Sequence, residues 1–158
     1  QGPAGPVLAR SPITGVMLRV VLFTPDDARM AAARRIRTEV FCGEQRVAPE
    51  IEWDGRDAVC DHFLILDGDT PIGAARLRDY HGSAKVERVA VLASHRGRGA
   101  GRDLMAAVIA RAKARGFAAV TLNAQVAVEG FYAAMGFAAE SDRFVEADIE
   151  HVRMTLRL

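Results

Sequence analysis

The chain has 158 residues, 50% of them hydrophobic, which is enough for one buried core and too few for two. Its 21 Lys and Arg residues nearly balance its 20 Asp and Glu residues. This balance excludes the broad positive field with which proteins hold nucleic acids by their phosphates. Any anion site must therefore be built locally.

The cysteines and the apolar runs narrow the class of protein further. Cys42 and Cys60 form no C-x-x-C pair and are too few for a disulfide framework or a zinc cluster. We therefore expect reduced, buried thiols in a cytoplasmic protein that holds no metal. No apolar run approaches the roughly 20 residues that cross a bilayer, and no secretory signal is evident, so no membrane partner is expected.

Residues 1–16 contain three prolines and three glycines and carry no evident chemistry. They are interpreted as an extended arm or a non-native remnant, with Met17 as a candidate native start. Residues 17–158 are predicted to form a single domain.

The elements of this domain begin with a β-branched strand over residues 18–23. A helix is predicted to follow, because Thr24 offers a capping hydroxyl, Pro25 suits the first helical position, and Asp26 and Asp27 suit the positive helix end. This helix should reach about Phe41. Residues 43–61 show no clean period, and such a long irregular segment in a compact domain is typical of a functional region.

The second half alternates strands and helices. Residues 62–66 and 71–79 predict an antiparallel hairpin, and residues 85–91 add a third strand. Apolar residues at helical spacing predict a helix from about Gly99 through Arg115, ended by Gly116. A strand over 118–124, a short helix over 128–135 and a tail strand over 151–158 complete the order, and the tail alternates His151 and Arg153 with Val152 and Met154.

The stretch "RGRGAG" at residues 96–101 lies between a strand and a helix. The backbone amides of a helix N-terminus bind anions, and glycines let a phosphate approach the main chain closely. A pyrophosphate is the natural ligand, although a simple turn with solvated arginines is the alternative. The stretch lacks the Gly-Lys-Ser/Thr ending of a nucleotide-triphosphate loop, and Leu104 stands where a dinucleotide fingerprint needs glycine.

The spacing Arg96-x-x-Gly99-x-Gly101 after the strand "VERVAV", together with "FYAAMGF" at 131–137, resembles the GNAT superfamily of acetyl-coenzyme A dependent N-acetyltransferases. The segments "DGRDAVCDHFLIL", "ARLR" and "NAQ" resemble the ElaA-like branch. The resemblance implies a mixed α+β fold, with a twisted, mostly antiparallel central sheet, one splayed parallel strand pair and helices on both faces. It also implies transfer of an acetyl group from acetyl-CoA to a primary amine by direct attack in a ternary complex.

The resemblance assigns coenzyme binding to three regions. The loop amides would hold the pyrophosphate, the strand before the loop would pair with the pantetheine arm, and a main-chain amide near Val89 would polarise the thioester carbonyl. The residues implied are Val89, Ala90, Val91, Arg96, Gly97, Arg98, Gly99, Ala100, Gly101, Arg102, Asn123 and Tyr132.

Tyr132 is the predicted general acid that returns a proton to the departing thiolate, with a core aromatic as the alternative. Glu87 is the candidate general base, because strand alternation places it on the face of Val89 and Val91. Spacing from the glycine loop, however, places the base of histone-type members on Lys85. Glu87 would otherwise be a surface carboxylate paired with Arg88 or Arg76, and His62 and His95 are weaker candidates.

The irregular segment over residues 43–61 carries the only indication of the acceptor. In the family this region lies over the acceptor site, and an acidic lip there would favour a small cationic amine. A solvated acidic loop is the alternative. The acids are Glu44, Glu50, Glu52, Asp54, Asp57 and Asp61, against Arg46 and Arg56.

Two other classes of function stay open on the sequence. A non-catalytic module that binds coenzyme A for regulation would keep the loop and dispense with Tyr132. A nucleic-acid binder would use Arg96, Arg98 and Arg102, but the neutral charge balance and the lack of interleaved aromatic residues speak against it. A free sheet edge would also allow a homodimer.

Overall fold

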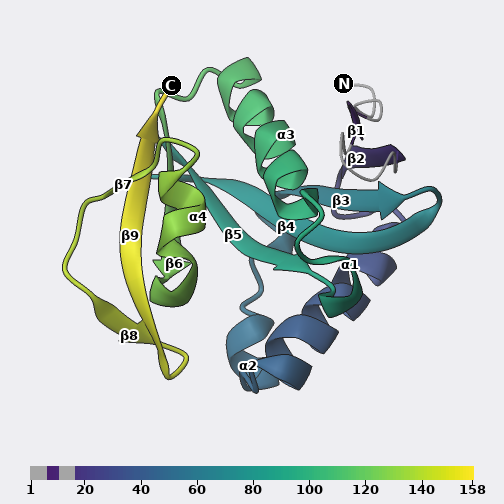
Figure 1. Ribbon diagram of the computed structural model, residues 1–158, viewed down its shortest axis with the longest axis horizontal. Coiled ribbons are helices and arrows are strands. Elements are labelled where there is room, and N and C mark those ends of the chain that lie inside the picture. Colours follow the sequence, from purple (N-terminus) through teal and green to yellow (C-terminus); the bar gives the residue numbers. More distant parts are fainter. Residues whose placement is uncertain (1–6, 11–16) are drawn as a thin grey trace.

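The computed structural model describes residues 7–10 and 17–158. Its nine strands form one sheet in the order β1-β2-β3-β4-β5-β6-β9-β7, with β8 paired to β9 (Figure 1). The strands are β1 (Val7–Arg10), β2 (Met17–Phe23), β3 (Asp61–Asp67), β4 (Thr70–Tyr80), β5 (Ser83–Val91), β6 (Ala119–Gln125), β7 (Ala138–Ala139), β8 (Phe144–Glu146) and β9 (Ile149–Arg157). β5 and β6 pair in parallel and the other strand pairs are antiparallel, which confirms the predicted fold class.

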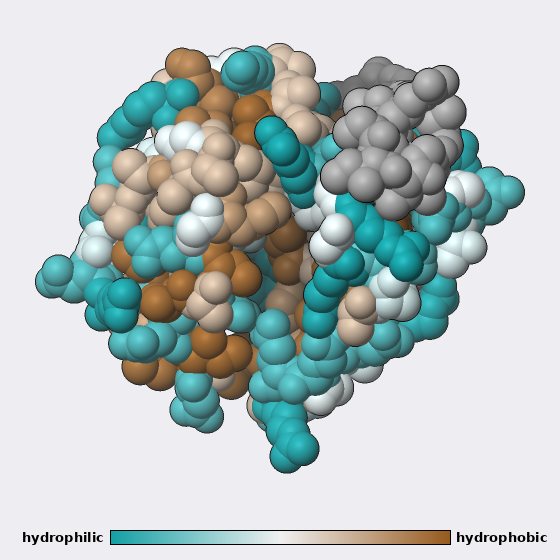
Figure 2. Space-filling model, in the orientation of Figure 1, coloured by the Kyte–Doolittle hydropathy of each residue, from teal (hydrophilic) through white to brown (hydrophobic). Residues whose placement is uncertain are grey.

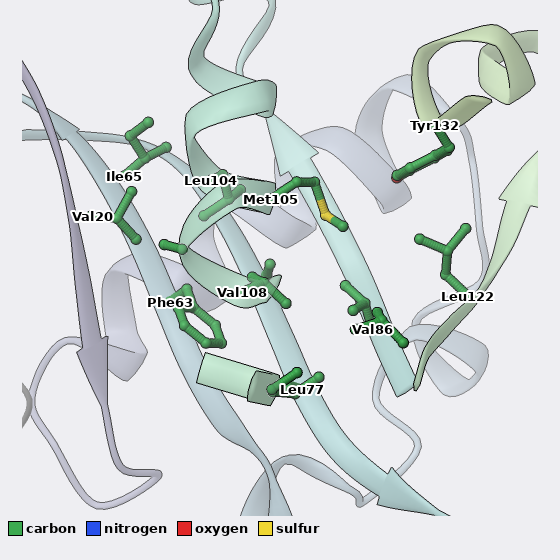
Figure 3. Close-up of a cluster of buried hydrophobic side chains, with 14 of the residues drawn as sticks. Val20, Phe63, Ile65, Leu77, Val86, Leu104, Met105, Val108, Leu122 and Tyr132 are labelled. Atoms are coloured by element: carbon green, nitrogen blue, oxygen red, sulfur yellow. The ribbon is translucent and has the colours of Figure 1, made fainter. Parts of the chain in front are cut away.

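Helices cover both faces of the sheet, as predicted. They are α1 (Met30–Arg37), α2 (Pro49–Glu52), α3 (Ala100–Ala114) and α4 (Glu129–Ala133). On one face α3 places Leu104, Met105 and Val108 at helical spacing against Phe63 and Leu77 of the sheet (Figure 3). On the opposite face, α1 buries its own apolar residues in a second cluster against β2, β3 and β4. The two clusters therefore lie on opposite faces of the sheet.

The start of the first helix differs from the prediction. Residues 24–29 form turns, and α1 begins only at Met30. The Thr24 hydroxyl donates to the Asp26 carboxylate at 2.5 Å, and the Asp27 carboxylate accepts from the Arg29 amide at 2.8 Å. These polar side chains therefore stabilise turns, a use that competes with helix capping.

The end of that helix also differs. α1 ends at Arg37 and passes into a π-helical segment, Thr38–Glu44. The following residues are mostly irregular, as predicted, apart from the single turn of α2 and a 3₁₀ turn over Asp57–Val59. π-helical turns occur frequently at functional sites, and this one borders the cavity.

The parallel strands part after a short contact. β5 and β6 pair only through Ala84 with Val120 and Lys85 with Thr121. Beyond this point the two strands diverge (Figure 1). We call the opening between them the wedge.

A β-bulge in β5 contributes to the opening. Ala74 pairs with Ala90 and Arg76 with Glu87, so that two residues of β5 stand opposite one of β4. Arg88 lies in this bulge with a φ of 58°. A bulge bends its strand and shifts the side chains that follow to the other face. Accordingly, Val86 packs in the α3 cluster and Ala90 in the α1 cluster, although strict alternation would place them together.

Candidate active site

A cavity of about 930 Å³ occupies the wedge. Its walls come from β5, β6, the N-terminus of α3, α4, the segment that follows α1 and the β8–β9 hairpin. Figure 2 shows the hollow in this face of the molecule, with hydrophobic residues at its sides. All the residues predicted to bind the coenzyme line this cavity except Arg98 and Arg102, whose side chains are exposed outside it.

The glycine loop presents main-chain donors to one end of the cavity. Gly97 and Gly99 have φ values of 77° and 84°, in the left-handed region that favours glycine. The Asp103 amide is the first in α3 to bond within the helix, to the Gly99 carbonyl at 3.0 Å. The preceding amides, at residues 100–102, therefore have no intrahelical partner and can receive an anion.

Arg96 has a different role in the structure from a simple phosphate contact. Its guanidinium donates two hydrogen bonds to the Glu44 carboxylate, at 2.7 and 2.8 Å, and a third to the Val91 carbonyl at 2.9 Å. Arg96 thus ties the end of the π-helical segment to the end of β5.

Tyr132 lies in the wall of the cavity and is 7% exposed. Its ring reaches from α4 toward β5 (Figure 3) and packs edge-on against Phe131 and Phe137. Burial raises the pKa of Tyr132 to about 12. The phenol is therefore protonated at neutral pH and can donate a proton, while its ring completes the core.

The predicted position of Glu87 is wrong, because the bulge at Arg88 breaks the alternation on which it depended. Glu87 lies on the face of its strand partner Arg76, and Val89 packs into the α3 cluster on the other face. Its carboxylate accepts hydrogen bonds from Arg76 at 3.0 Å and from Arg78 at 2.8 Å. Lys85 adds a third cation at 3.5 Å.

These contacts make the Glu87 carboxylate a poor proton acceptor. Burial by itself would raise its pKa, but the Arg78 hydrogen bond and the neighbouring charges bring the pKa to about 2. Glu87 is paired with Arg76, as one alternative reading of the sequence had it, but it is largely buried, not on the surface. The geometry therefore favours a structural role for this side chain.

Glu87 belongs to an ion-pair cluster that fixes the irregular segment to the sheet. Arg76 is 1% exposed and donates to Asp54 and Asp57 as well as to Glu87. Burial raises the pKa of Glu52, which lies 2.7 Å from Arg37 and 2.8 Å from Arg88. The cluster consists of Arg37, Glu52, Asp54, Asp57, Arg76, Arg78, Lys85, Glu87 and Arg88.

The pairing extends to two of the three remaining acids of residues 43–61. Glu44 is paired with Arg96, and Asp61 with Arg111 and Arg115. Within the described ranges, Glu50 is the one acid of this segment that has no Lys, Arg or His within 4.0 Å. The segment therefore does not form the expected acidic lip.

Three of the four histidines lie in or near the site, each in a different environment. His62 is buried, bonds to the Asp57 carbonyl at 2.8 Å and does not line the cavity, and burial lowers its pKa. His95 lines the cavity and contacts Asp67 at 3.0 Å. His151, which the sequence analysis placed only on the polar side of the tail strand, is 6% exposed and also lines the cavity. The alternation of the tail strand carries no signal of this burial.

Both thiols are free, as predicted, but only Cys60 is buried, and the burial predicted for Cys42 is wrong. Cys60 is buried, which raises its pKa to about 11, and burial also raises the pKa of the half-buried Cys42. Neither thiol is therefore activated as a nucleophile. Among residues 7–10 and 17–158, no helix is long and apolar enough to cross a membrane.

Comparison with known proteins gives this geometry a family context. Residues 37–158 match the model of the acetyltransferase (GNAT) domain. The chain is 36% identical over 130 residues to the uncharacterized N-acetyltransferase YjcF of Bacillus subtilis, covering 82% of this chain and 93% of that protein.

Two solved structures share the fold. Escherichia coli ElaA superposes with a TM-score of 0.79 at 23% identity, covering 88% of this chain and 99% of ElaA. A GNAT family acetyltransferase from Elizabethkingia anophelis, determined with acetyl-CoA bound, superposes with a TM-score of 0.68 at 14% identity and covers 89% and 98% of the two chains. At these identities the likeness is one of fold.

Proposed function

The chain belongs to the GNAT acetyltransferase family, and we propose that it transfers an acetyl group from acetyl-CoA to a primary amine by direct attack in a ternary complex. One observation carries the proposal. A single cavity joins the unbonded amides at the start of α3 to the protonated phenol of Tyr132 across the wedge.

The coenzyme would lie along this cavity. The amides at residues 100–102 suit its pyrophosphate, because a helix N-terminus attracts anions. Val89 and Val91 line the opening that β6 leaves, and their main chain would pair with the pantetheine arm, while Asn123 would contact it from the other wall. The acetyl-CoA bound to the Elizabethkingia protein of the same fold supports this assignment.

The chemistry would then take place beside Tyr132. Attack of the amine on the thioester carbonyl forms the C–N bond and expels coenzyme A as a thiolate. The Tyr132 phenol donates its proton to that sulfur as general acid. An amide in the β5 bulge, near Val89, would stabilise the oxyanion of the tetrahedral intermediate.

Calorimetric titration tests the coenzyme site. We expect acetyl-CoA to bind and S-acetylpantetheine, which lacks the pyrophosphate, to bind at least tenfold more weakly. Equal affinities would contradict the assignment of the glycine loop. Absence of binding by the folded protein would withdraw the proposed function.

Thiol release from acetyl-CoA, followed with a thiol reagent, tests the chemistry. The raised thiol pKa values of Cys42 and Cys60 keep the protein's own background low. With spermidine, tyramine, glucosamine and hydroxylamine as acceptors, we expect Tyr132→Phe to lower kcat by about 10²- to 10⁴-fold at unchanged coenzyme affinity. Tyr80→Phe, which removes the only other tyrosine, is the matched control. Binding without thiol release from any acceptor would favour the non-catalytic, regulatory module instead.

A further inference from the structure

We propose that His151 is the general base of this reaction and that Glu146 binds the ammonium group of the acceptor. The inference rests on the proposed function and names the two groups of the acceptor site. The acceptor is then a cationic primary amine, and the evidence for this is the β8–β9 hairpin instead of residues 43–61.

The charges in the cavity wall single out Glu146. The carboxylates that line the cavity are those of Glu44, Glu52, Asp54, Glu87 and Glu146. Each of the first four lies within 4.0 Å of an arginine. In the described part of the chain, Glu146 has no Lys or Arg within that distance, and its side chain is 53% exposed. It is therefore the cavity carboxylate whose charge is left for a ligand.

The His151 ring is held in one tautomer beside Glu146. Its Nδ1 lies 2.7 Å from the Ile149 carbonyl oxygen. A carbonyl oxygen only accepts, so Nδ1 carries the hydrogen, and the neutral ring has its lone pair on Nε2. That Nε2 atom lies 3.9 Å from the Glu146 carboxylate. Stacking on Phe144, with ring centroids 5.9 Å apart, fixes the plane of the ring.

The hairpin turn brings the two groups together. Glu146 and Ile149 pair across a two-residue turn, Ala147-Asp148, whose φ values are 52° and 61°. Such turns strongly favour Asn-Gly or Gly, so this one is strained. Backbone strain of this kind clusters at functional sites. On the other side, β9 pairs with β6 and places His151 opposite Gln125, which also lines the cavity.

The proton balance of the reaction requires a base of this kind. The acceptor enters as an ammonium ion paired with Glu146 and gives one proton to Nε2 of His151, which frees its lone pair for attack on the thioester carbon. The C–N bond forms, the C–S bond breaks, and the thiolate takes the proton of Tyr132. A second proton of the former ammonium restores the phenol, and the His151 imidazolium, stabilised by Glu146, releases its proton to water.

Two nucleophiles separate this role from a structural one. Spermidine is protonated at pH 7 and needs a base, whereas hydroxylamine is uncharged and does not. We expect His151→Gln to lower kcat/KM by about 10²- to 10⁴-fold with spermidine and by less than tenfold with hydroxylamine. His81→Gln, in the turn between β4 and β5, is the matched control. An equal loss with both nucleophiles would overturn the assignment.

Glu146→Gln provides a second test at a half-exposed position where folding is not at risk. We expect a rise of at least tenfold in the KM for spermidine and little change for hydroxylamine. Glu150→Gln, exposed on the same hairpin and outside the cavity wall, should match the unsubstituted protein. If Glu146→Gln leaves the KM for spermidine unchanged, the ammonium site is wrong.

Nitrogen-15 NMR of the histidine-labelled protein reads the tautomer directly. We expect the hydrogen of neutral His151 on Nδ1, and a hydrogen on Nε2 would overturn the proposal. A protein that binds coenzyme yet releases no thiol with either nucleophile would also overturn it. Failure to bind coenzyme would instead refute the proposed function itself.

Discussion

Arg76 is the centre of the ion-pair cluster, and its removal should destabilise the protein severely. Its guanidinium, 1% exposed, donates to Asp54 at 2.6 and 3.0 Å, to Asp57 at 2.9 Å and to Glu87 at 3.0 Å. Arg76→Met keeps the apolar stem and leaves three buried or half-buried carboxylates without their shared cation.

The expected cost follows from the burial of these charges. Breaking a buried ion pair by removing one partner costs about 3–5 kcal/mol. For a domain of this size 1 kcal/mol shifts Tm by about 2–4 °C, so the expected fall in Tm is about 6–20 °C. Calorimetry and urea unfolding at pH 7 measure both quantities.

The control is the same substitution at an exposed pair of the same sheet. Arg19 donates to Asp69 at 3.2 Å on the surface, and Arg19→Met should cost no more than about 1 kcal/mol. The double variant Arg76→Met/Asp54→Asn should recover part of the loss, since one of the three carboxylates that share Arg76 is then neutral. If the free energy of unfolding of Arg76→Met lies within about 0.5 kcal/mol of that of the unsubstituted protein, the cluster does not hold residues 43–61 in place.

Three further perturbations test other parts of the structure. Gly99→Ala and Gly116→Ala place alanine at φ values of 84° and 83° at the two ends of α3, so each should lower Tm by about 2–8 °C. Only Gly99→Ala should also weaken acetyl-CoA binding, measured by calorimetric titration. Equal losses of binding in the two variants would refute the loop assignment. Gly73→Ala would place its Cβ 2.7 Å from Ile65 and 2.8 Å from the Ala90 carbonyl of β5. It should therefore lower the free energy of unfolding in urea by about 1–3 kcal/mol and weaken coenzyme binding. Gly43→Ala, whose Cβ would have its nearest contact at 3.6 Å, should change neither quantity. The pKa of Glu87 falls from its usual 4.5 to about 2 on folding, so ionised Glu87 stabilises the folded protein fully above pH 4.5 and this stabilisation is lost as pH falls toward 2. The loss is on the order of 3 kcal/mol in all. Glu87→Gln should therefore flatten the pH dependence of the free energy of unfolding in this window, and an unchanged pH dependence would contradict the pairing.

The features that could be predicted from the sequence are those whose cause is local. The helical spacing of Leu104, Met105 and Val108 predicted α3, because that period requires one buried face. The glycines of residues 96–101 predicted a loop between a strand and the start of a helix, and the structure contains this loop between β5 and α3. The strand patterns and the family motifs then led to the fold class and to the cavity residues.

The features that were missed depend on neighbours distant in the chain. Thr24 and Asp26 had the residue types of a helix start, but the helix begins at Met30, where burial against the sheet begins. The bulge at Arg88 arises from pairing with β4, and nothing in "VERVAV" signals it. A single residue added to one strand reversed the face predicted for Glu87.

The sequence by itself therefore determined most of the elements, the glycine loop and the family, because backbone preference and hydrophobic period depend on residues that are close together in the chain. Only the tertiary structure decided which charges remain for a substrate. Five of the six acids of residues 43–61 are paired with arginines from α1, β4, β5, the glycine loop and α3, whereas Glu146 and His151 meet across a hairpin in the cavity wall. Ion pairing depends on distances of a few ångströms in space, whatever the separation of the residues along the chain. The charges left for a substrate could therefore be identified only in the folded structure.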